Sequence, residues 1–219
     1  MRRPPRGGRR SSSLEDMHVL GQATISATPG EAWRTRDIVV TAVIGVVFGV
    51  VFWAWNSLYA GLGFLTPPLS DVVYGMWLVP AILAPLVIRK PGAALFAEMA
   101  AAGVSALLGS QWGPDTLLSG FVQGAAAELV FAFVVYRRWS LPILAVAAVA
   151  SAAAAWAHDW VIYYADASIE LQVIRLAVMA ASAIAFAAFG SLALERSLER
   201  AGVLQGFGRG PARTGGLAG

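Results

Sequence analysis

The chain has 219 residues, of which 58% are hydrophobic and 13% charged, and its formal net charge at pH 7 is +3. Its mean hydropathy of +0.65 is too apolar for a single soluble core, which excludes an ordinary soluble domain. The sequence has no cysteine, which excludes disulfides and thiolate metal sites and leaves helix packing as the source of stability.

The first segment differs from the rest of the chain. It contains RRPPRGGRRSSS, which is basic, rich in proline, glycine and serine, and free of apolar periodicity. No apolar stretch of the signal-peptide type follows at a suitable distance. We therefore expect residues 1–34 to form a disordered, basic cytoplasmic arm.

Six apolar segments follow, each of a length suited to about 30 Å of hydrocarbon. They cover approximately residues 37–59, 71–88, 92–109, 115–136, 141–164 and 171–194. The links between them are short, so neighbouring helices are expected to be antiparallel. Pro80 and Pro85 lie inside the second segment and predict a kinked or broken helix there, because proline donates no backbone hydrogen bond.

Lysine and arginine occur in alternate links. They lie in the arm, at residues 89–90, at residues 137–138 and after the sixth segment, whereas the other three links contain none. The positive-inside rule therefore predicts cytoplasmic N and C termini. The expected fold is an all-α membrane protein, a six-transmembrane-helix bundle over residues 35–197, followed by a flexible cytoplasmic tail over residues 198–219. No GxxxxGKS/T motif occurs, so any energy source is expected to be ionic or to come from a partner.

Two carboxylates lie inside apolar segments, Glu98 in the third and Glu128 in the fourth. An acidic residue at the centre of a membrane helix costs at least about 2.5–3.5 kcal/mol, which makes both candidate functional residues. At about 1.5 Å per residue, both are expected at a similar depth in the cytoplasmic half, with Gln123 nearer the outside. Gln123 and Glu128 are about 140° apart around a helix, so they are not expected to share a narrow face.

The tryptophans are concentrated toward the expected outer side. Trp112 and Trp160 fit an interfacial aromatic belt, whereas Trp77 and Trp156 lie too deep for one. Aromatic faces above carboxylates suit a flat ligand that is cationic or carries an amine. The pattern therefore predicts a cavity that opens outward.

Further polar groups lie near the outer ends of the fifth and sixth segments. Asp159 and Arg175 are expected to form an ion pair between helices, and His158 is within reach of acidic residues. A metal site needs at least three convergent ligands, and these residues differ in depth from Glu98 and Glu128. Metal transport is therefore not favoured.

Small residues recur every fourth position in the first segment, at Thr41, Gly45 and Gly49. Such a stripe lets another helix approach closely. Packing within the bundle and docking of a separate membrane subunit are both consistent with it.

The chain from Arg36 to about Leu204 resembles the substrate-binding S components of energy-coupling-factor (ECF) transporters, and most closely the YkoE family, which is associated with thiamine and hydroxymethylpyrimidine. The motifs that carry the resemblance are TRDIVVTAVIGVVFGVVFWAWN, RKPGAALFAEMAAAGVSALLGSQWG and GFVQGAAAELVFAF. The resemblance implies a vitamin-capturing protein without a catalytic site or a cofactor. It also implies docking on an EcfT-like coupling subunit driven by two cytoplasmic ATPases, with Thr41, Gly45 and Gly49 on the docking face.

The same resemblance implies a ligand site toward the outer side, below a loop that covers residues 56–70. An aminopyrimidine needs a carboxylate or amide at its edge, and a thiazolium needs aromatic faces and negative charge. We expect Glu98 or Glu128, together with Gln123, to bind the pyrimidine and Asp159 to lie nearer the thiazolium or the mouth. The other expected contributors are three stacking tryptophans and three further residues: Trp53, Trp77, Trp156, Asn56, Trp112 and His158.

Two other interpretations are open on the sequence. An ion-coupled secondary transporter of a cationic or amine-bearing solute, working alone, would also carry acids inside the membrane, although no inverted repeat is evident. A structural membrane module would use the acids only to pair with Arg175 or with backbone groups.

Overall fold

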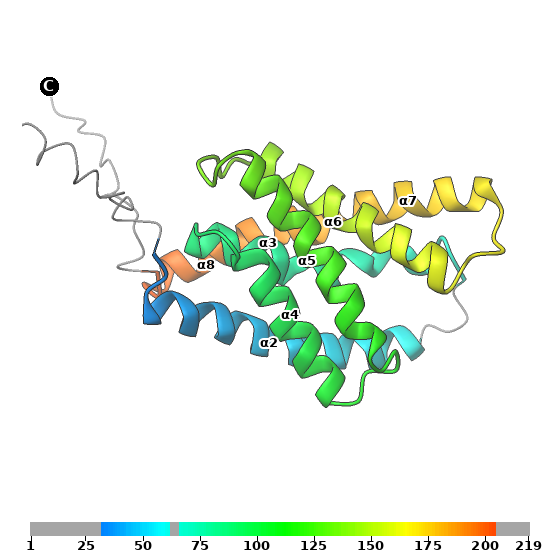
Figure 1. Cartoon of the computed structure of the whole chain (residues 1–219), viewed down its shortest axis with the longest axis horizontal. Coiled ribbons are helices and arrows are strands. Elements are labelled where there is room, and N and C mark those ends of the chain that lie inside the picture. Colours follow the sequence, from blue (N-terminus) through cyan, green and yellow to red (C-terminus); the bar gives the residue numbers. More distant parts are fainter. Residues whose placement is uncertain (1–31, 62–65, 205–219) are drawn as a thin grey trace, which may run out of the picture. The chain divides into compact units, whose positions relative to one another are not determined.

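The computed structural model describes residues 32–61 and 66–204, and this part of the chain contains helices and no strand (Figure 1). Almost all of the expected arm, the tail from residue 205 onward and residues 62–65 of the expected loop lie outside the described residues. The elements in chain order are α2 (Thr35–Gly61), the 3₁₀ helix η1 (Ser70–Leu78), α3 (Val79–Ile88), α4 (Ala93–Leu107), α5 (Asp115–Phe133), α6 (Leu141–Ile162), α7 (Ile169–Ala183), the π-helical η2 (Ile184–Phe189) and α8 (Gly190–Arg200).

These elements make up the six apolar segments that the sequence predicts. Five are long and apolar enough to cross a membrane: Thr35–Gly61, Ser70–Ile88, Asp115–Phe133, Leu141–Ile162 and Ile169–Arg200. The sixth, α4, is a shorter apolar helix of 15 residues. Two crossings are composite, because η1 continues into α3, and α7 continues through η2 into α8.

The second crossing is broken, as its prolines predict. It begins as the 3₁₀ helix η1, and α3 then starts at Val79 with Pro80 in its first turn. Every residue of α3 is buried, and the helix contacts α2, α4, α5, α6 and α8. Its sequence, VPAILAPLVI, has no charged side chain, so it can be enclosed without the cost of desolvating a charge.

The small-residue stripe of α2 lies against α4 (Figure 1). Thr41, Gly45 and Gly49 are all buried. A Cβ added to Gly45 would collide with the Ala100 side chain, and one added to Gly49 would lie 2.7 Å from a methyl carbon of Val104. The stripe therefore serves packing within the chain, and α4 covers the face on which a partner subunit was expected to dock.

The last crossing extends further than the sequence predicts. Helix α8 continues to Arg200, beyond the expected domain end at residue 197. Leu204 is also buried, in a cluster that includes Val79, Leu83 and Leu198. The folded part therefore includes residues assigned to a flexible tail, because their apolar side chains still contact α3 and α8.

Candidate functional site

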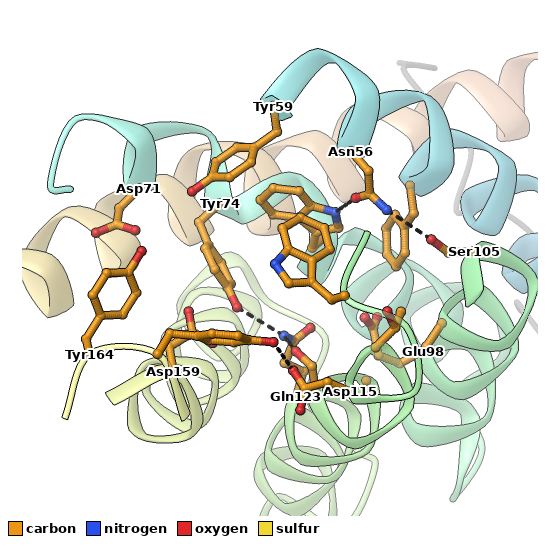
Figure 2. Close-up of a pocket in the computed structure, with 18 of the residues that line it drawn as sticks. Asn56, Tyr59, Asp71, Tyr74, Glu98, Ser105, Asp115, Gln123, Asp159 and Tyr164 are labelled. Carbon is orange, nitrogen blue, oxygen red and sulfur yellow. Dashed lines mark hydrogen bonds between the residues drawn. The ribbon is translucent and has the colours of Figure 1, made fainter. Parts of the chain in front are cut away.

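A cavity of about 260 Å³ lies between η1 and the helices α2, α4, α5, α6 and α7 (Figure 2). Its volume is close to the lower limit that is typical of small-molecule sites. The wall combines aromatic rings with buried polar groups: Phe52, Asn56, Tyr59, Asp71, Tyr74, Trp77, Glu98, Ala102, Ser105, Trp112, Asp115, Thr116, Ser119, Gly120, Gln123, Asp159, Tyr163, Tyr164 and Arg175.

Four aromatic side chains form one wall of the cavity, and Trp77 of η1 lies at its centre. The Trp77 ring packs edge-on against Tyr59, Tyr74 and Trp112, with centroid separations of 5.2, 5.3 and 5.6 Å. Its indole N–H donates to the Asn56 Oδ1 at 2.9 Å, which fixes the orientation of the ring. Edge-to-face contacts of this kind are favourable and hold the wall in a defined shape before any ligand binds.

Glu98 enters the cavity from α4 and is 1% exposed. Its Oε2 accepts a hydrogen bond from the Ala81 backbone N–H at 3.1 Å. That N–H lies in the first turn of α3, where a backbone N–H has no acceptor within its own helix. Because α3 starts at the break in the second crossing, the break makes this donor available to Glu98. Within the described residues Glu98 accepts this one hydrogen bond, which leaves Oε1 available to a ligand.

Gln123 of α5 is also buried beside the cavity. Its amide nitrogen donates to the Ser119 hydroxyl at 2.6 Å and to the Tyr74 hydroxyl at 3.3 Å (Figure 2). Both interactions use the donor side of the amide. The carbonyl oxygen therefore remains an acceptor for a ligand amine.

A buried ion pair lies at the end of the cavity where Figure 2 shows Asp71 and Tyr164, away from Glu98. Arg175 of α7 donates from Nε and Nη2 to the two carboxylate oxygens of Asp71, at 2.9 and 3.3 Å, and its Nη2 lies 3.6 Å from Asp159. Its guanidinium also stacks 3.8 Å above the Tyr164 ring. The Nη1 atom is buried without a hydrogen-bond partner in the described part of the chain, so a bound ligand could still receive a bond from it.

A second polar cluster lies where α5 begins and α6 ends. The His158 ring is 3.0 Å from Asp115 and 3.1 Å from Asp159, and the Tyr163 hydroxyl donates to Asp115. Burial, followed by the Asp115 carboxylate, raises the pKa of the Tyr163 phenol, which therefore remains a neutral donor. The carboxylates and Tyr163 line the cavity, whereas His158 lies behind them.

The structure brings together Glu98, Gln123, Asn56, Trp77, Trp112 and Asp159, all of which the sequence marked as candidate ligand-binding residues. It also adds wall residues that the sequence pattern did not single out, chiefly Tyr59, Tyr74, Asp71, Asp115 and Tyr164. Tyrosine is common at the ends of membrane helices, so nothing in the sequence distinguished these rings from an aromatic belt. The predicted contact of Arg175 with Asp159 is present, but Asp71 is the nearer partner.

Glu128 lies outside the cavity and accepts hydrogen bonds at the start of α4. Its carboxylate receives the backbone N–H groups of Gly92 and Ala94, at 2.6 and 2.9 Å, and the Tyr136 hydroxyl. The N-terminus of a helix has unpaired N–H groups and a partial positive charge, which together stabilise a carboxylate there. In this structure Glu128 joins α5 to α4.

Three other candidate residues also lie off the cavity wall. Trp53 is 44% exposed, on the outer face of α2. Trp156 donates its indole N–H to the Gln172 carbonyl at 2.9 Å and packs against Trp160. His158 reaches the wall through the two aspartates described above and through the Tyr163 ring, whose centroid lies 6.2 Å from that of the imidazole. Helix rotation decides these placements, and the sequence alone does not specify it.

The apolar crossings and the enclosed polar cavity define a membrane-embedded protein that binds a small solute. Residues 36–154 match the family described as "ABC-type cobalt transport system, permease component". Over 182 residues the chain is 35% identical to the curated "Putative HMP/thiamine permease protein YkoE" of Bacillus subtilis; the match covers 82% of this chain and 92% of that protein.

A solved structure described as "Crystal structure of an S-component of ECF transporter" is similar to this fold, with a TM-score of 0.79 and 35% sequence identity. That match covers 81% of this chain and 91% of the other. The chain belongs to this permease family, as a substrate-binding S component of an ECF transporter that spans the plasma membrane several times. Both relatives are described as transport proteins.

Proposed function

We propose that this S component captures thiamine or its hydroxymethylpyrimidine precursor in the cavity and delivers it for ATP-driven import. The observation that carries the proposal is the combination of an aromatic wall around Trp77 with the buried carboxylates Glu98, Asp71 and Asp159 in one cavity. A planar, amine-bearing cation needs both kinds of group. The name of the Bacillus subtilis relative, a putative HMP/thiamine permease, supports the same ligand class.

Each part of such a ligand has a counterpart on the cavity wall. Glu98 Oε1 and the Gln123 carbonyl oxygen would accept from the exocyclic amine of the pyrimidine, and Trp77 would stack on a ring. Asp159 would lie nearer the thiazolium or the mouth. Both proposed ligands carry a hydroxyl group, which could accept from the unpartnered Nη1 of Arg175.

The family description names cobalt, but the cavity favours an organic ligand. The described residues contain no group of three or more His, Cys, Asp or Glu side chains arranged to hold a metal ion. Asp71 and Asp159 face Arg175 instead, and the rest of the wall combines aromatic rings with uncharged and acidic polar side chains.

We further propose that both termini are cytoplasmic and that the cavity opens to the outside. Trp112, Asp115 and Tyr163 line the cavity and lie in or next to the links that contain no lysine or arginine. Import would then require an EcfT-like coupling subunit and two cytoplasmic ATPases. Residues 1–34 would form the cytoplasmic arm.

Titration of the purified protein with thiamine and with hydroxymethylpyrimidine, followed by tryptophan fluorescence, tests the ligand. Trp77→Phe should remove most of the quenching and weaken binding, whereas the matched control Trp53→Phe, on an exposed face, should leave the affinity unchanged. Glu98→Gln should weaken binding by at least about tenfold, because the amide replaces one of the two carboxyl oxygens with an NH₂ donor. Unchanged affinity in both Trp77→Phe and Glu98→Gln would contradict the proposed site.

Reconstituted uptake tests the partners. Transport by liposomes should require ATP and the coupling subunits, and the isolated protein should bind the ligand without moving it. Uptake driven by an ion gradient with this chain alone would instead support a stand-alone secondary transporter.

A further inference from the structure

Arg175 is the only lysine or arginine among the described residues that line the cavity. Its side chain is 1% exposed, and a guanidinium keeps its positive charge in a protein. Four acidic side chains share the wall with it: Asp71, Glu98, Asp115 and Asp159. The arrangement of these acids around Arg175 determines whether the cavity can receive a negatively charged ligand.

A guanidinium binds an oxyanion best through two parallel N–H groups on one edge, and both such edges of Arg175 already face a carboxylate. The edge formed by Nε and Nη2 donates to the two oxygens of Asp71, at 2.9 and 3.3 Å. On the edge formed by Nη1 and Nη2, Asp159 lies 3.6 Å from Nη2, and the Tyr164 ring covers one face of the group. Nη1 alone has no hydrogen-bond partner among the described residues, so no complete edge remains for an anion.

The charge of the wall is also unfavourable for an anion. The guanidinium has donors and no acceptor, so Asp71 is its counter-ion and the pair has no net charge. Glu98, Asp115 and Asp159 add no charge or negative charge, whichever protonation state each adopts. His158 lies behind the wall against two of these acids, so a proton on its ring would offset their charge. A phosphate group, with a charge of about −1.5 to −2 at pH 7, would therefore enter without a counter-ion.

We propose that Asp71, with Asp159 beside it, determines specificity by occupying Arg175, so that the cavity takes ligands with a free hydroxyl group and rejects their phosphate monoesters. This inference rests on the proposed function, because it concerns the same cavity and the same class of ligand. A hydroxyl oxygen is neutral and can accept a single hydrogen bond from Nη1. A phosphate monoester at that hydroxyl would instead bring negative charge against the two aspartates.

A series of ligands tests the rejection on the wild-type protein. Tryptophan fluorescence measures the affinities for thiamine, for hydroxymethylpyrimidine, for the phosphate monoester of each and for O-acetylthiamine. The phosphate monoesters should bind at least about a hundredfold more weakly than the alcohols, because an uncompensated charge enters a buried site. The acetyl ester enlarges the same position without adding charge, so it should bind more tightly than the phosphate. Phosphate monoesters that bind within about tenfold of the alcohols, or an acetyl ester as weak as the phosphate, would overturn the proposal.

Removal of the counter-ion tests the role of the aspartates. Asp71→Asn should strengthen the binding of thiamine monophosphate relative to thiamine by at least about tenfold, because the amide leaves the charge of the guanidinium unbalanced. Asp159→Asn should shift this ratio in the same direction by a smaller factor, and it provides the test if Asp71→Asn does not fold. Glu128→Gln is the matched control, since it also converts an acid to an amide but lies outside the cavity, and it should leave the ratio unchanged. An unchanged ratio in the folded aspartate variants would overturn the proposal.

Inorganic phosphate separates this proposal from the proposed ligand. Phosphate should raise the Tm of the aspartate variants more than that of the wild type or of Glu128→Gln, because the guanidinium is then free to pair with it. If the wild type bound neither thiamine nor hydroxymethylpyrimidine, the proposed function would be contradicted, while this Tm difference would still support the role of Asp71. Equal Tm increases in all of these proteins would overturn the role of Asp71, whether or not thiamine binds.

Discussion

Gly75 places η1 directly against the backbone of α7, and its replacement by alanine is expected to destabilise the protein. A Cβ added to Gly75 would overlap the Ser182 carbonyl oxygen and lie 2.6 Å from the carbonyl carbon. Ordinary carbon–carbon contact begins at about 3.5 Å, so the two elements would have to separate by roughly 0.9 Å. Backbone atoms on both sides make this shift difficult to absorb locally.

The same shift breaks a hydrogen bond. The Gly75 backbone N–H donates to the Ser182 hydroxyl at 2.8 Å, and that hydroxyl donates to the Val72 carbonyl at 2.6 Å. Separation would carry the first of these distances well past the usual limit of about 3.2 Å. We expect a loss of about 1 kcal/mol for the hydrogen bond and about 1–3 kcal/mol for the disturbed packing, or roughly 2–4 kcal/mol in total.

Thermal unfolding in detergent measures the effect. Gly75→Ala should lower Tm by roughly 5–15 °C. It should also weaken ligand binding, because η1 carries Asp71, Tyr74 and Trp77 of the cavity wall. Gly103→Ala is the matched control, since a Cβ there meets no atom of the described residues within 4 Å and alanine favours a helix. A Gly75→Ala protein with the Tm of the wild type would refute this reasoning.

Three further substitutions test the packing and the buried charges. Glu128→Gln should lower Tm, because an amide has only one acceptor oxygen for the N–H groups at the start of α4. Its ligand affinity should stay within about twofold of the wild type. A tenfold loss of affinity would instead place Glu128 in the ligand site. Gly49→Leu should lower Tm or prevent folding, because Val104 fills the space, whereas Gly61→Leu, which meets no neighbour among the described residues, should fold normally. Asp71→Asn should cost about 3–5 kcal/mol in unfolding free energy, since it removes the nearer of the two carboxylates that face a buried guanidinium. Glu195→Gln, whose ionic partner is partly exposed, should cost less than about 1 kcal/mol; equal losses in these two variants would contradict this account.

The crossings could be predicted from local sequence. Each apolar segment is long enough to span a membrane whatever its neighbours are, and Pro80 breaks the second crossing because it lacks an N–H. The prediction that Glu98 contributes to a functional site also had a local basis, since an acidic side chain inside an apolar helix needs a hydrogen-bond donor. The particular donor, the Ala81 N–H, depends on α3 starting beside α4 and could not be read from the sequence.

Side-chain partners across helices were less predictable. The sequence suggested Asp159 as the partner of Arg175, and the structure shows Asp71 closer, from a different crossing. The small-residue stripe could face another helix of the chain or a partner, and α4 occupies it. In both cases the sequence defined the chemistry of the group but left its neighbour open.

The sequence by itself determined the membrane class, the number of crossings and which crossing is broken, because these follow from hydropathy, length and backbone chemistry along one segment. The tertiary structure alone decided which of the two acids in apolar helices reaches the cavity. Glu98 faces the aromatic wall and Glu128 faces the start of α4, although both lie in apolar helices. The rotation of each helix about its axis makes this difference, and close packing at small residues such as Gly120 and Gly124, where α5 meets α4, sets that rotation.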